Sequence, residues 1–291
     1  MITSAANMTV SSSGNPYALG STDAEHERLI SQAARLAPCT ERFFSEAGIG
    51  RGQRVLDVGS GVGDVAMLAA QLVGPSGEVV GVERDARAVA RAKDRVAEAG
   101  LHNVSFTQCD VSEIASDKPF DAAVGRFILQ FIFDPVAVLR SLSQLVRPGG
   151  VVAFQEVSYG PFLLLSAHLP LWSAGVSIIH QTLQQAGANT EIGLALNQIF
   201  QEVGLPAPTM RMEILLGSDP GFTRWTYDLI CSLRPQIQKY NVSLEPLGDF
   251  DTLPGRLQSE VAASKSVVPF VALVGAWSHK PTGEGLPHAV R

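Results

Sequence analysis

Three glycines at alternate positions follow a short apolar segment and an aspartate. Residues 55–64 read VLDVGSGVGD, with glycines at Gly59, Gly61 and Gly63. Glycine accepts positive φ angles and lets a ligand lie against bare backbone. Asp57 adds a carboxylate just before the first glycine. The segment is therefore predicted to be a bend that binds a small molecule.

The spacing of the glycines indicates which kind of small molecule this is. A dinucleotide-binding loop reads G-x-G-x-x-G, whereas here Asp64 takes the place of the last glycine, and an acid at that helix start would repel a pyrophosphate. Two more acids, Glu83 and Asp110, follow the next two predicted strands. Their carboxylates can accept hydrogen bonds from ribose hydroxyls and from an adenine amine. The set fits a nucleoside that carries positive charge and no phosphates.

These side chains need a parallel sheet to bring them together. Between residues 54 and 156, expected strands (RVLDV, GEVVGVE, NVSFTQ, FDAAVGRF, GGVVAFQE) alternate with expected helices (DVAMLAAQLV, DARAVARAKDRVAEAG, PVAVLRSLSQLV). Such alternation predicts βαβ units in a mostly parallel sheet covered on both faces. Ligands bind at the carboxyl edge of such sheets. Upstream, a capping box at Thr22–Glu25 starts a helix, which we expect Pro38 to end before a second short helix carries Phe43 and Phe44.

Composition excludes several classes of protein. Hydrophobic residues make up 46% and charged residues 17% of the 291, which predicts a packed core rather than disorder. The net charge of −6 argues against nucleic acid as a partner. Three scattered cysteines without a CxxC pair predict neither disulfides nor a metal site. Without a signal peptide or an apolar run of membrane-spanning length, we expect a cytoplasmic protein that does not insert into membranes.

Five segments in register carry a family resemblance. VLDVGSGVGD, VVGVERD, FTQCDVSE, FDAAVGRFILQF and LVRPGGVVAFQE cover residues 54–156. In order and spacing they resemble class I S-adenosylmethionine-dependent methyltransferases of the ubiquinone/menaquinone-biosynthesis-like, small-molecule group. The opening NPYALGSTDAEHERLISQA also resembles the N-terminal helix that covers the cofactor there. The resemblance implies an α/β Rossmann-like sheet, mostly parallel with an antiparallel final strand, plus helical lid insertions. It implies S-adenosylmethionine as cofactor and S-adenosylhomocysteine as product.

The same resemblance implies roles for residues near the cofactor. The methionine part would lie at the glycine loop, the ribose at Glu83, and the adenine beside Asp110 and the backbone of Val111. Arg126 would lie near the methyl group. The full set of implied cofactor-binding residues is Tyr17, Asp57, Gly59, Ser60, Gly61, Gly63, Glu83, Arg84, Asp110, Val111 and Arg126.

The expected domain organisation follows from these patterns. We expect a flexible N-terminus over 1–20, lid helices and the cofactor-binding core over 21–156, a helical lid insertion over 157–207, the rest of the core over 208–280 with a helical insertion over 219–264, and a flexible tail over 281–291. The stretches GVSIIHQTLQQAG and VVPFVALVGAW could equally contact a second subunit, as in a homodimer.

The expected function is transfer of a methyl group, by SN2 displacement, to a small hydrophobic or aromatic acceptor such as a secondary metabolite or quinone-like compound. If the acceptor must lose a proton, Glu156 at the end of the fifth predicted strand and His180 in a helical pattern are the candidate bases. Each has an ordinary alternative, helix capping for Glu156 and packing for His180. The alternative functions are an NAD-dependent oxidoreductase, a non-catalytic binder of S-adenosylmethionine or S-adenosylhomocysteine, and a protein or RNA methyltransferase.

Overall fold

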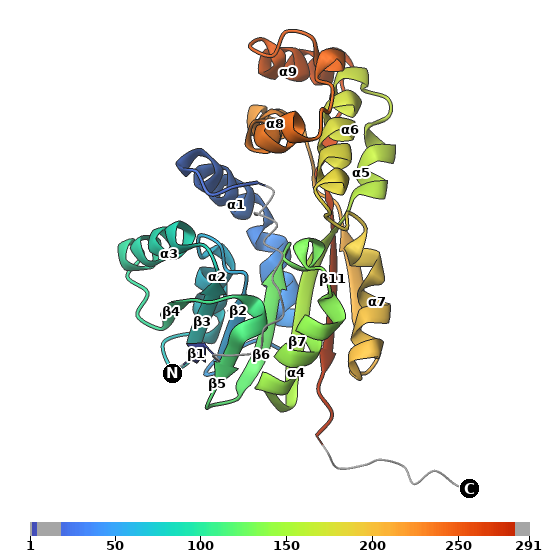
Figure 1. Cartoon of the computed structure of the whole chain (residues 1–291). Coiled ribbons are helices and arrows are strands. Elements are labelled where there is room, and N and C mark those ends of the chain that lie inside the picture. Colours follow the sequence, from blue (N-terminus) through green and yellow to red (C-terminus); the bar gives the residue numbers. More distant parts are fainter. Residues whose placement is uncertain (1, 5–18, 283–291) are drawn as a thin grey trace, which may run out of the picture.

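A seven-stranded sheet forms the centre of the molecule. The computed structural model describes residues 2–4 and 19–282 of the chain. The order of the strands across the sheet is β4 (Val104–Gln108), β3 (Glu78–Glu83), β2 (Arg54–Val58), β6 (Phe120–Arg126), β7 (Val146–Ser158), β11 (Ala272–His279) and β8 (Thr209–Glu213) (Figure 1).

The pairing of the strands creates a ligand-binding position. Strands β4, β3, β2, β6 and β7 are mutually parallel, and β11 runs antiparallel to both β7 and β8. The predicted mostly parallel sheet with an antiparallel final strand is thus confirmed. From β2 the chain proceeds outward through β3 and β4, then returns to β6 on the other side of β2. The crevice beyond the carboxyl ends of β2 and β6 is the switch point where such sheets bind ligands.

Helices cover both faces of the sheet. On one face lie α1 (Asp23–Glu46), α2 (Asp64–Val73) and α3 (Ala86–Glu98), and on the other lie α4 (Pro135–Leu145) and α7 (Ile192–Val203). Neighbouring residues of a strand face opposite layers. Val55 accordingly packs in one buried cluster with α2, whereas Leu56 packs in the other with α4.

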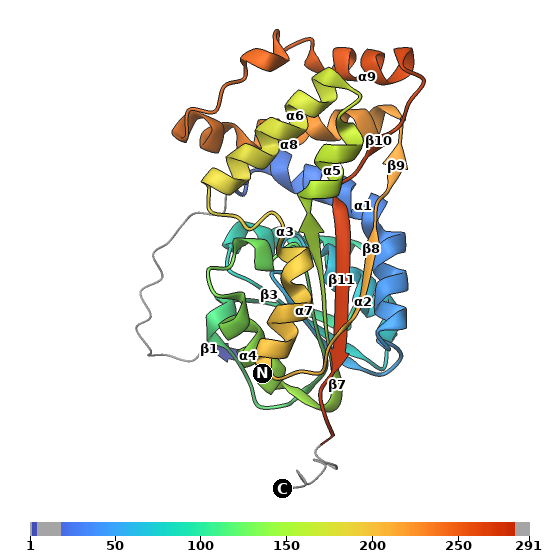
Figure 2. The same cartoon turned by 90° about the vertical axis from the view of Figure 1, so that its right-hand side faces the viewer.

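Four further helices form a layer beyond the carboxyl edge of the sheet. This lid consists of α5 (Tyr159–Ser166), α6 (Pro170–Gln185), α8 (Pro220–Lys239) and α9 (Leu253–Ala263), which pack on one another (Figures 1 and 2). Trp172 and Phe162 are fully buried in it. The remaining short elements are β1 (Ile2–Ser4) with β5 (Ile114–Ser116), β9 (Leu216–Gly217) with β10 (Val268–Pro269), and the 3-10 turns η1 (Val111–Glu113), η2 (Leu129–Phe131) and η3 (Glu245–Leu247).

The N-terminal helix differs from its prediction. Thr22 caps α1 as expected, accepting a hydrogen bond from the Glu25 amide at 3.2 Å, but one helix then continues through Pro38 instead of breaking. Pro38 and Ala34, whose carbonyl loses its helical partner, lie on the exposed side, where water can satisfy that carbonyl. Leu36 on the opposite side is fully buried. Core packing therefore holds the two halves in one helix.

Two other segments lie elsewhere than expected. Helix α7, within the range assigned to a lid insertion, packs against β7, β11 and α4. Of the two stretches considered for subunit contacts, VVPFVALVGAW is largely interior to this chain, because β11 lies between β7 and β8. GVSIIHQTLQQAG has one buried side, with Ile179 and Leu183, and one exposed side. The homodimer remains a prediction. In the part of the chain that the structure describes, no helix combines the length and hydropathy needed to cross a bilayer.

Candidate functional site

A cavity of about 570 Å³ lies at the switch point, between the sheet edge and the lid. Two groups of residues line it. The loop half comprises Gly59, Ser60, Gly61, Glu83, Arg84, Asp110, Val111 and neighbours from the carboxyl ends of β2, β3 and β4. The lid half comprises Arg28, Leu29, Gln32, Gln130, Tyr159, Leu183, Trp225, Leu229 and Val271. Arg126 and Phe127, at the end of β6, also line the cavity.

The glycine loop has the backbone that its composition predicts. Gly59, Gly61 and Gly63 have φ angles of 66°, 51° and 91°. A Cβ on Gly59 would lie 2.6 Å from Cδ1 of Ile128, whereas one on Gly61 would meet no atom within 4 Å. Gly63, which caps α2, does not line the cavity. Gly59 thus permits close packing, and Gly61 leaves open space at the cavity wall.

The two predicted strand-end carboxylates share this cavity. Glu83 accepts a hydrogen bond from the Gly61 amide at 3.0 Å and another from the Asp85 amide at 2.9 Å. Asp110 accepts from the amide and hydroxyl of Ser112 at 2.9 and 2.7 Å. Glu83 therefore fixes the glycine loop to the end of β3 while facing the cavity. Of the other predicted residues, Tyr17 lies outside the described residues.

Asp57 lies behind the loop rather than on the cavity wall. Its side chain is 1% exposed, and Oδ2 has no hydrogen-bond partner in the described structure; the same holds for the buried hydroxyl of Ser60. Burial raises the pKa of Asp57 to about 7, although the charge of Arg126 favours its ionised form. Asp57, in β2, and Ser60, in the loop, therefore each carry a buried polar atom that no described residue satisfies.

Arg126 connects the sheet edge to α1. Its Nη1 donates to the Thr40 hydroxyl at 3.0 Å, and that hydroxyl donates to Oε1 of Gln155 at 2.7 Å. Burial lowers the pKa of Arg126, while Asp64 and Asp57 favour its charged form. This chain of hydrogen bonds holds α1 against the ends of β6 and β7.

Glu156, the first candidate base, does not reach the cavity. Strand β7 continues to Ser158, so Glu156 lies inside it, fully buried, and its Oε1 accepts from the amides of Ile128 and Leu129, both at 2.9 Å. Burial raises the pKa of Glu156 to about 8, against the effect of those amides. The carboxyl group thus holds the turn that follows β6.

His180, the second candidate base, does not line the cavity either. Its Nε2 hydrogen-bonds to the Thr190 hydroxyl at 3.0 Å, and its ring stacks on Tyr159 at 5.6 Å between centroids. Burial lowers the pKa of His180, opposed by Glu191. His180 therefore supports the position of Tyr159, which does line the cavity.

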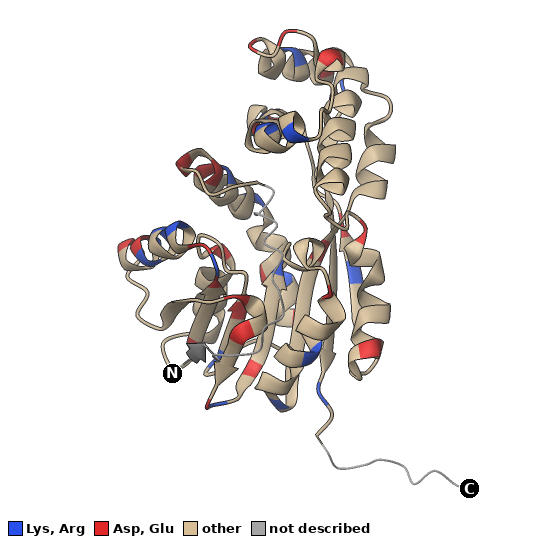
Figure 3. Ribbon diagram, viewed as in Figure 1, with Lys and Arg blue, Asp and Glu red and all other residues tan. Residues whose placement is uncertain are grey.

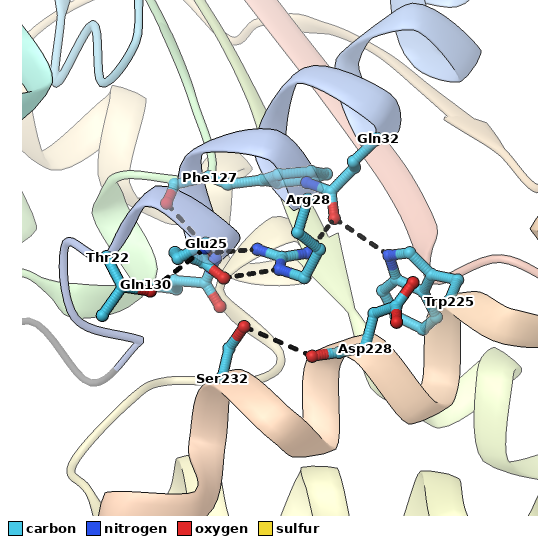
Figure 4. Close-up of polar contacts among 9 residues, drawn as sticks. All are labelled: Thr22, Glu25, Arg28, Gln32, Phe127, Gln130, Trp225, Asp228 and Ser232. Atoms are coloured by element: carbon cyan, nitrogen blue, oxygen red, sulfur yellow. Dashed lines mark hydrogen bonds and ion pairs between the residues drawn. The ribbon is translucent and has the colours of Figure 1, made fainter. Parts of the chain in front are cut away.

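A polar group on α1 was not anticipated from the sequence. Glu25, Arg28 and Gln32 are 1%, 8% and 9% exposed. Arg28 donates from Nε and Nη2 to the Glu25 carboxylate, each at 2.7 Å, and from Nη1 to Gln32 Oε1 at 2.8 Å (Figure 4). Trp225 Nε1 of α8 donates to the same oxygen at 3.0 Å. Glu25, Arg28 and Gln32 have the spacing i, i+3, i+7, which places them on the same helix face as Leu36. This pattern can be recognised in the sequence when polar as well as apolar residues are assigned to the buried face of the helix.

The start of α1 is also tied to α3. The Ser21 hydroxyl donates to Oδ1 of Asp85 at 2.7 Å, and Arg87 donates to Asp23 at 2.9 Å. Figure 3 shows acidic residues at the start of α1 and both basic and acidic residues along α3. His26, 5% exposed and lining the cavity, hydrogen-bonds to the Ser21 hydroxyl at 3.0 Å. These contacts hold α1 over the loop half of the cavity.

One electrostatic argument from the sequence weakens in the structure. Asp64, expected to repel a pyrophosphate, forms an ion pair with Arg95 at 2.8 Å. Its charge is therefore largely balanced, and the case against a dinucleotide cannot depend on this residue.

Comparisons with known proteins resolve the family. The model of a methyltransferase domain matches residues 49–203, more than half of the chain. A ubiquinone/menaquinone biosynthesis C-methyltransferase of Cellvibrio japonicus is 35% identical over 121 residues, which are 40% of this chain and 49% of that protein. Its counterpart in Pseudomonas aeruginosa strain LESB58 is 34% identical over 129 residues, 43% of this chain and 50% of that protein. The matched region thus spans about half the length of these relatives.

Solved structures share the fold at low sequence identity. A putative methyltransferase from Bacillus halodurans aligns with a TM-score of 0.53 at 14% identity, covering 84% of this chain and 99% of that one. A putative sarcosine dimethylglycine methyltransferase from Galdieria sulphuraria gives 0.52 at 15% identity, covering 86% and 85%. With a fold of this kind, a predicted glycine loop at the switch point and a matching domain model, the chain belongs to the class I S-adenosylmethionine-dependent methyltransferases.

Proposed function

We propose that this protein transfers the methyl group of S-adenosylmethionine to a small, largely apolar molecule bound beneath the lid. The observation that carries the proposal is the continuity of one cavity from the glycine loop and its carboxylates to an apolar compartment under α1, α6 and α8. A cofactor and an acceptor that share one cavity can meet without a diffusing intermediate.

The loop half fits the cofactor of the family. Glu83 would accept hydrogen bonds from the ribose hydroxyls, and Asp110 with the Val111 backbone would bind the adenine. Gly61 offers backbone beside open space, and the unsatisfied Asp57 Oδ2 and Ser60 hydroxyl lie at the same loop. The carboxylates of Glu83 and Asp110 on the cavity wall suit a nucleoside that carries positive charge. S-adenosylmethionine supplies an activated methyl group on a positively charged sulfur.

The residues of this chain then contribute positioning and enclosure. Arg126 and Phe127, at and directly after the end of β6, line the cavity together with both halves, and we place the boundary between the halves there. An acceptor held in the lid half would therefore approach the methyl group across this boundary. Alignment of two bound reactants and exclusion of water account for much of the rate in such displacements.

The acceptor is proposed to be hydrophobic and to fit an aromatic or quinone-like shape. Leu29, Leu183, Leu229 and Val271 supply apolar walls, and Trp225 supplies an aromatic one. The names of the curated relatives place them in quinone biosynthesis, which agrees with such an acceptor. A non-catalytic protein that binds the same cofactor is the second candidate function. One structure that shares the fold, with a TM-score of 0.50, is described as a [4+2]-cyclase, so this fold is not restricted to methyl transfer.

Titration calorimetry and a mass-spectrometric search test the proposal. The purified protein is titrated with S-adenosylmethionine, S-adenosylhomocysteine and NADH, then incubated with S-adenosylmethionine and a small-molecule extract to find a compound that gains one CH₂. Glu83→Gln is expected to weaken S-adenosylmethionine binding about tenfold or more, because hydrogen bonds to a charged acceptor are lost. Glu98→Gln, an exposed position on α3, is the matched control.

Each contrary result has a distinct meaning. Binding of NADH without S-adenosylmethionine would overturn the proposal in favour of an oxidoreductase. Binding of S-adenosylmethionine without any methylated product would favour the non-catalytic candidate.

A further inference from the structure

We propose that Gln32 selects the methyl acceptor: its side-chain amide donates a hydrogen bond to an oxygen atom of an otherwise apolar molecule in the lid half of the cavity. The inference rests on the proposed function and specifies the chemical class of the acceptor.

The orientation of the Gln32 amide follows from its neighbours. Oε1 accepts from Arg28 Nη1 at 2.8 Å and from Trp225 Nε1 at 3.0 Å (Figure 4). A guanidinium and an indole N–H are donors only, so the amide must turn its oxygen toward them. The Nε2 group with its two hydrogens is thereby directed away from both.

The Nε2 group has no described acceptor. Gln32 is 9% exposed and lines the cavity, and no hydrogen bond joins Nε2 to any described residue. Nε2 is not one of the buried side-chain atoms that lack a partner, so it lies at an accessible surface. A ligand that fills the cavity shields this N–H donor from water and must supply an acceptor in its place, because a buried donor without a partner is unfavourable. The cofactor-binding loop lies in the other half of the cavity, which leaves the methyl acceptor as the partner.

The group is held in place before any ligand binds. Glu25 fixes the guanidinium of Arg28 with two hydrogen bonds, each 2.7 Å long. Trp225 is 6% exposed and packs against Phe270 with ring centroids 4.5 Å apart. Two helices from opposite ends of the chain, α1 and α8, thus position one amide. Recognition by a pre-positioned donor loses little conformational entropy.

The surroundings define the ligand class. Leu29, Leu183, Leu229 and Val271 line the same compartment, so the body of the acceptor is apolar. The amide donors require an oxygen that accepts hydrogen bonds, such as a carbonyl or a hydroxyl oxygen. A ligand that lacks this oxygen would leave the buried N–H unpaired, and sites of this kind reject such analogues strongly. We therefore assign the lid half to apolar molecules with one accepting oxygen near Gln32.

Two substitutions separate recognition from structure. Gln32→Glu keeps an oxygen for Arg28 and Trp225 but replaces the two N–H donors with a second acceptor. Gln32→Leu removes both functions at similar volume. The full-length protein, saturated with S-adenosylhomocysteine, is titrated with acetophenone and 2-acetylnaphthalene, each compared with its ethyl analogue, ethylbenzene or 2-ethylnaphthalene. Binding is followed by ligand-observed NMR, and unfolding temperature is recorded for every variant.

In the wild-type protein the ketone is expected to bind about tenfold more tightly than its ethyl analogue. In Gln32→Glu this preference disappears, while the unfolding temperature and S-adenosylhomocysteine affinity stay near the wild-type values. A wild-type protein with no preference for either ketone overturns the inference. So does a Gln32→Glu variant that retains the preference when Gln32→Leu loses it, because the role would then be structural. Failure to bind S-adenosylhomocysteine contradicts the proposed function instead.

Discussion

Replacing single glycines of the loop by alanine should distinguish a glycine needed for close packing from a glycine needed for ligand binding. Gly59→Ala and Gly61→Ala both place a side chain at positive φ, 66° and 51°. Only the first also places a Cβ 2.6 Å from Ile128 Cδ1; the second enters open space. Gly100, at φ 64° with nothing within 4 Å of its Cβ and away from the cavity lining, is a matched reference.

The expected energies follow from these two terms. The left-handed conformation costs a non-glycine residue about 1–2 kcal/mol, and all three variants share this cost. The contact with Ile128 adds an overpacking cost of about 1–3 kcal/mol to Gly59→Ala alone. With about 2–4 °C per kcal/mol for a protein near this size, Gly59→Ala should unfold about 2–12 °C below Gly61→Ala. Gly61→Ala should match Gly100→Ala in stability.

Gly61→Ala, which should be as stable as Gly100→Ala, should nevertheless bind the cofactor more weakly. The added methyl group of Gly61→Ala occupies space that the loop leaves for the ligand, so affinity for S-adenosylmethionine should fall about tenfold or more, while Gly100→Ala binds normally. Thermal unfolding and titration calorimetry measure the two effects. If Gly61→Ala were as unstable as Gly59→Ala, or bound S-adenosylmethionine like the wild type, the assignment of Gly61 to the ligand-facing surface would be refuted.

Two further outcomes can be measured on other parts of the fold. Burial raises the pKa of Glu156 from 4.5 to about 8, so between these pH values the unfolded state binds fewer protons than the folded state. The free energy of unfolding of the wild-type protein should therefore fall relative to that of Glu156→Gln as pH rises from 5 to 8, by at most about 1.4 kcal/mol per pH unit. Urea unfolding measures this, and parallel pH profiles for the two proteins would contradict it. Ser21→Ala removes the 2.7 Å hydrogen bond to Asp85 and should cost about 0.5–1.5 kcal/mol and speed amide hydrogen exchange at the start of α1. Ser45→Ala, whose hydroxyl bonds only within α1, should leave that exchange unchanged.

The positions of the loop half could be predicted because they depend on local rules. In a parallel sheet every strand that follows a helix ends at the same edge, so Glu83, Asp110 and Arg126 reach one cavity from their places at strand ends alone. Predictions for residues whose environment is set by distant parts of the chain were wrong. Pro38 was expected to break a helix because its exposed position in α1 is not visible in the sequence. Glu156 was expected at an open edge because pairing with β11, which extends β7 to Ser158, involves the far end of the chain.

The lid half depends on contacts between segments that are distant in sequence, and this explains why its chemistry was missed. Gln32 meets Trp225 across 193 residues, and nothing near either residue indicates the other. A polar residue on the apolar face of an isolated helix would be unfavourable. Here Trp225 of α8 and Arg28 each donate a hydrogen bond to the Gln32 oxygen, and Gln32 lines the cavity. The unfavourable local feature is the informative one, because a buried polar group that the fold orients but does not fully satisfy is where a ligand contributes the missing hydrogen bond.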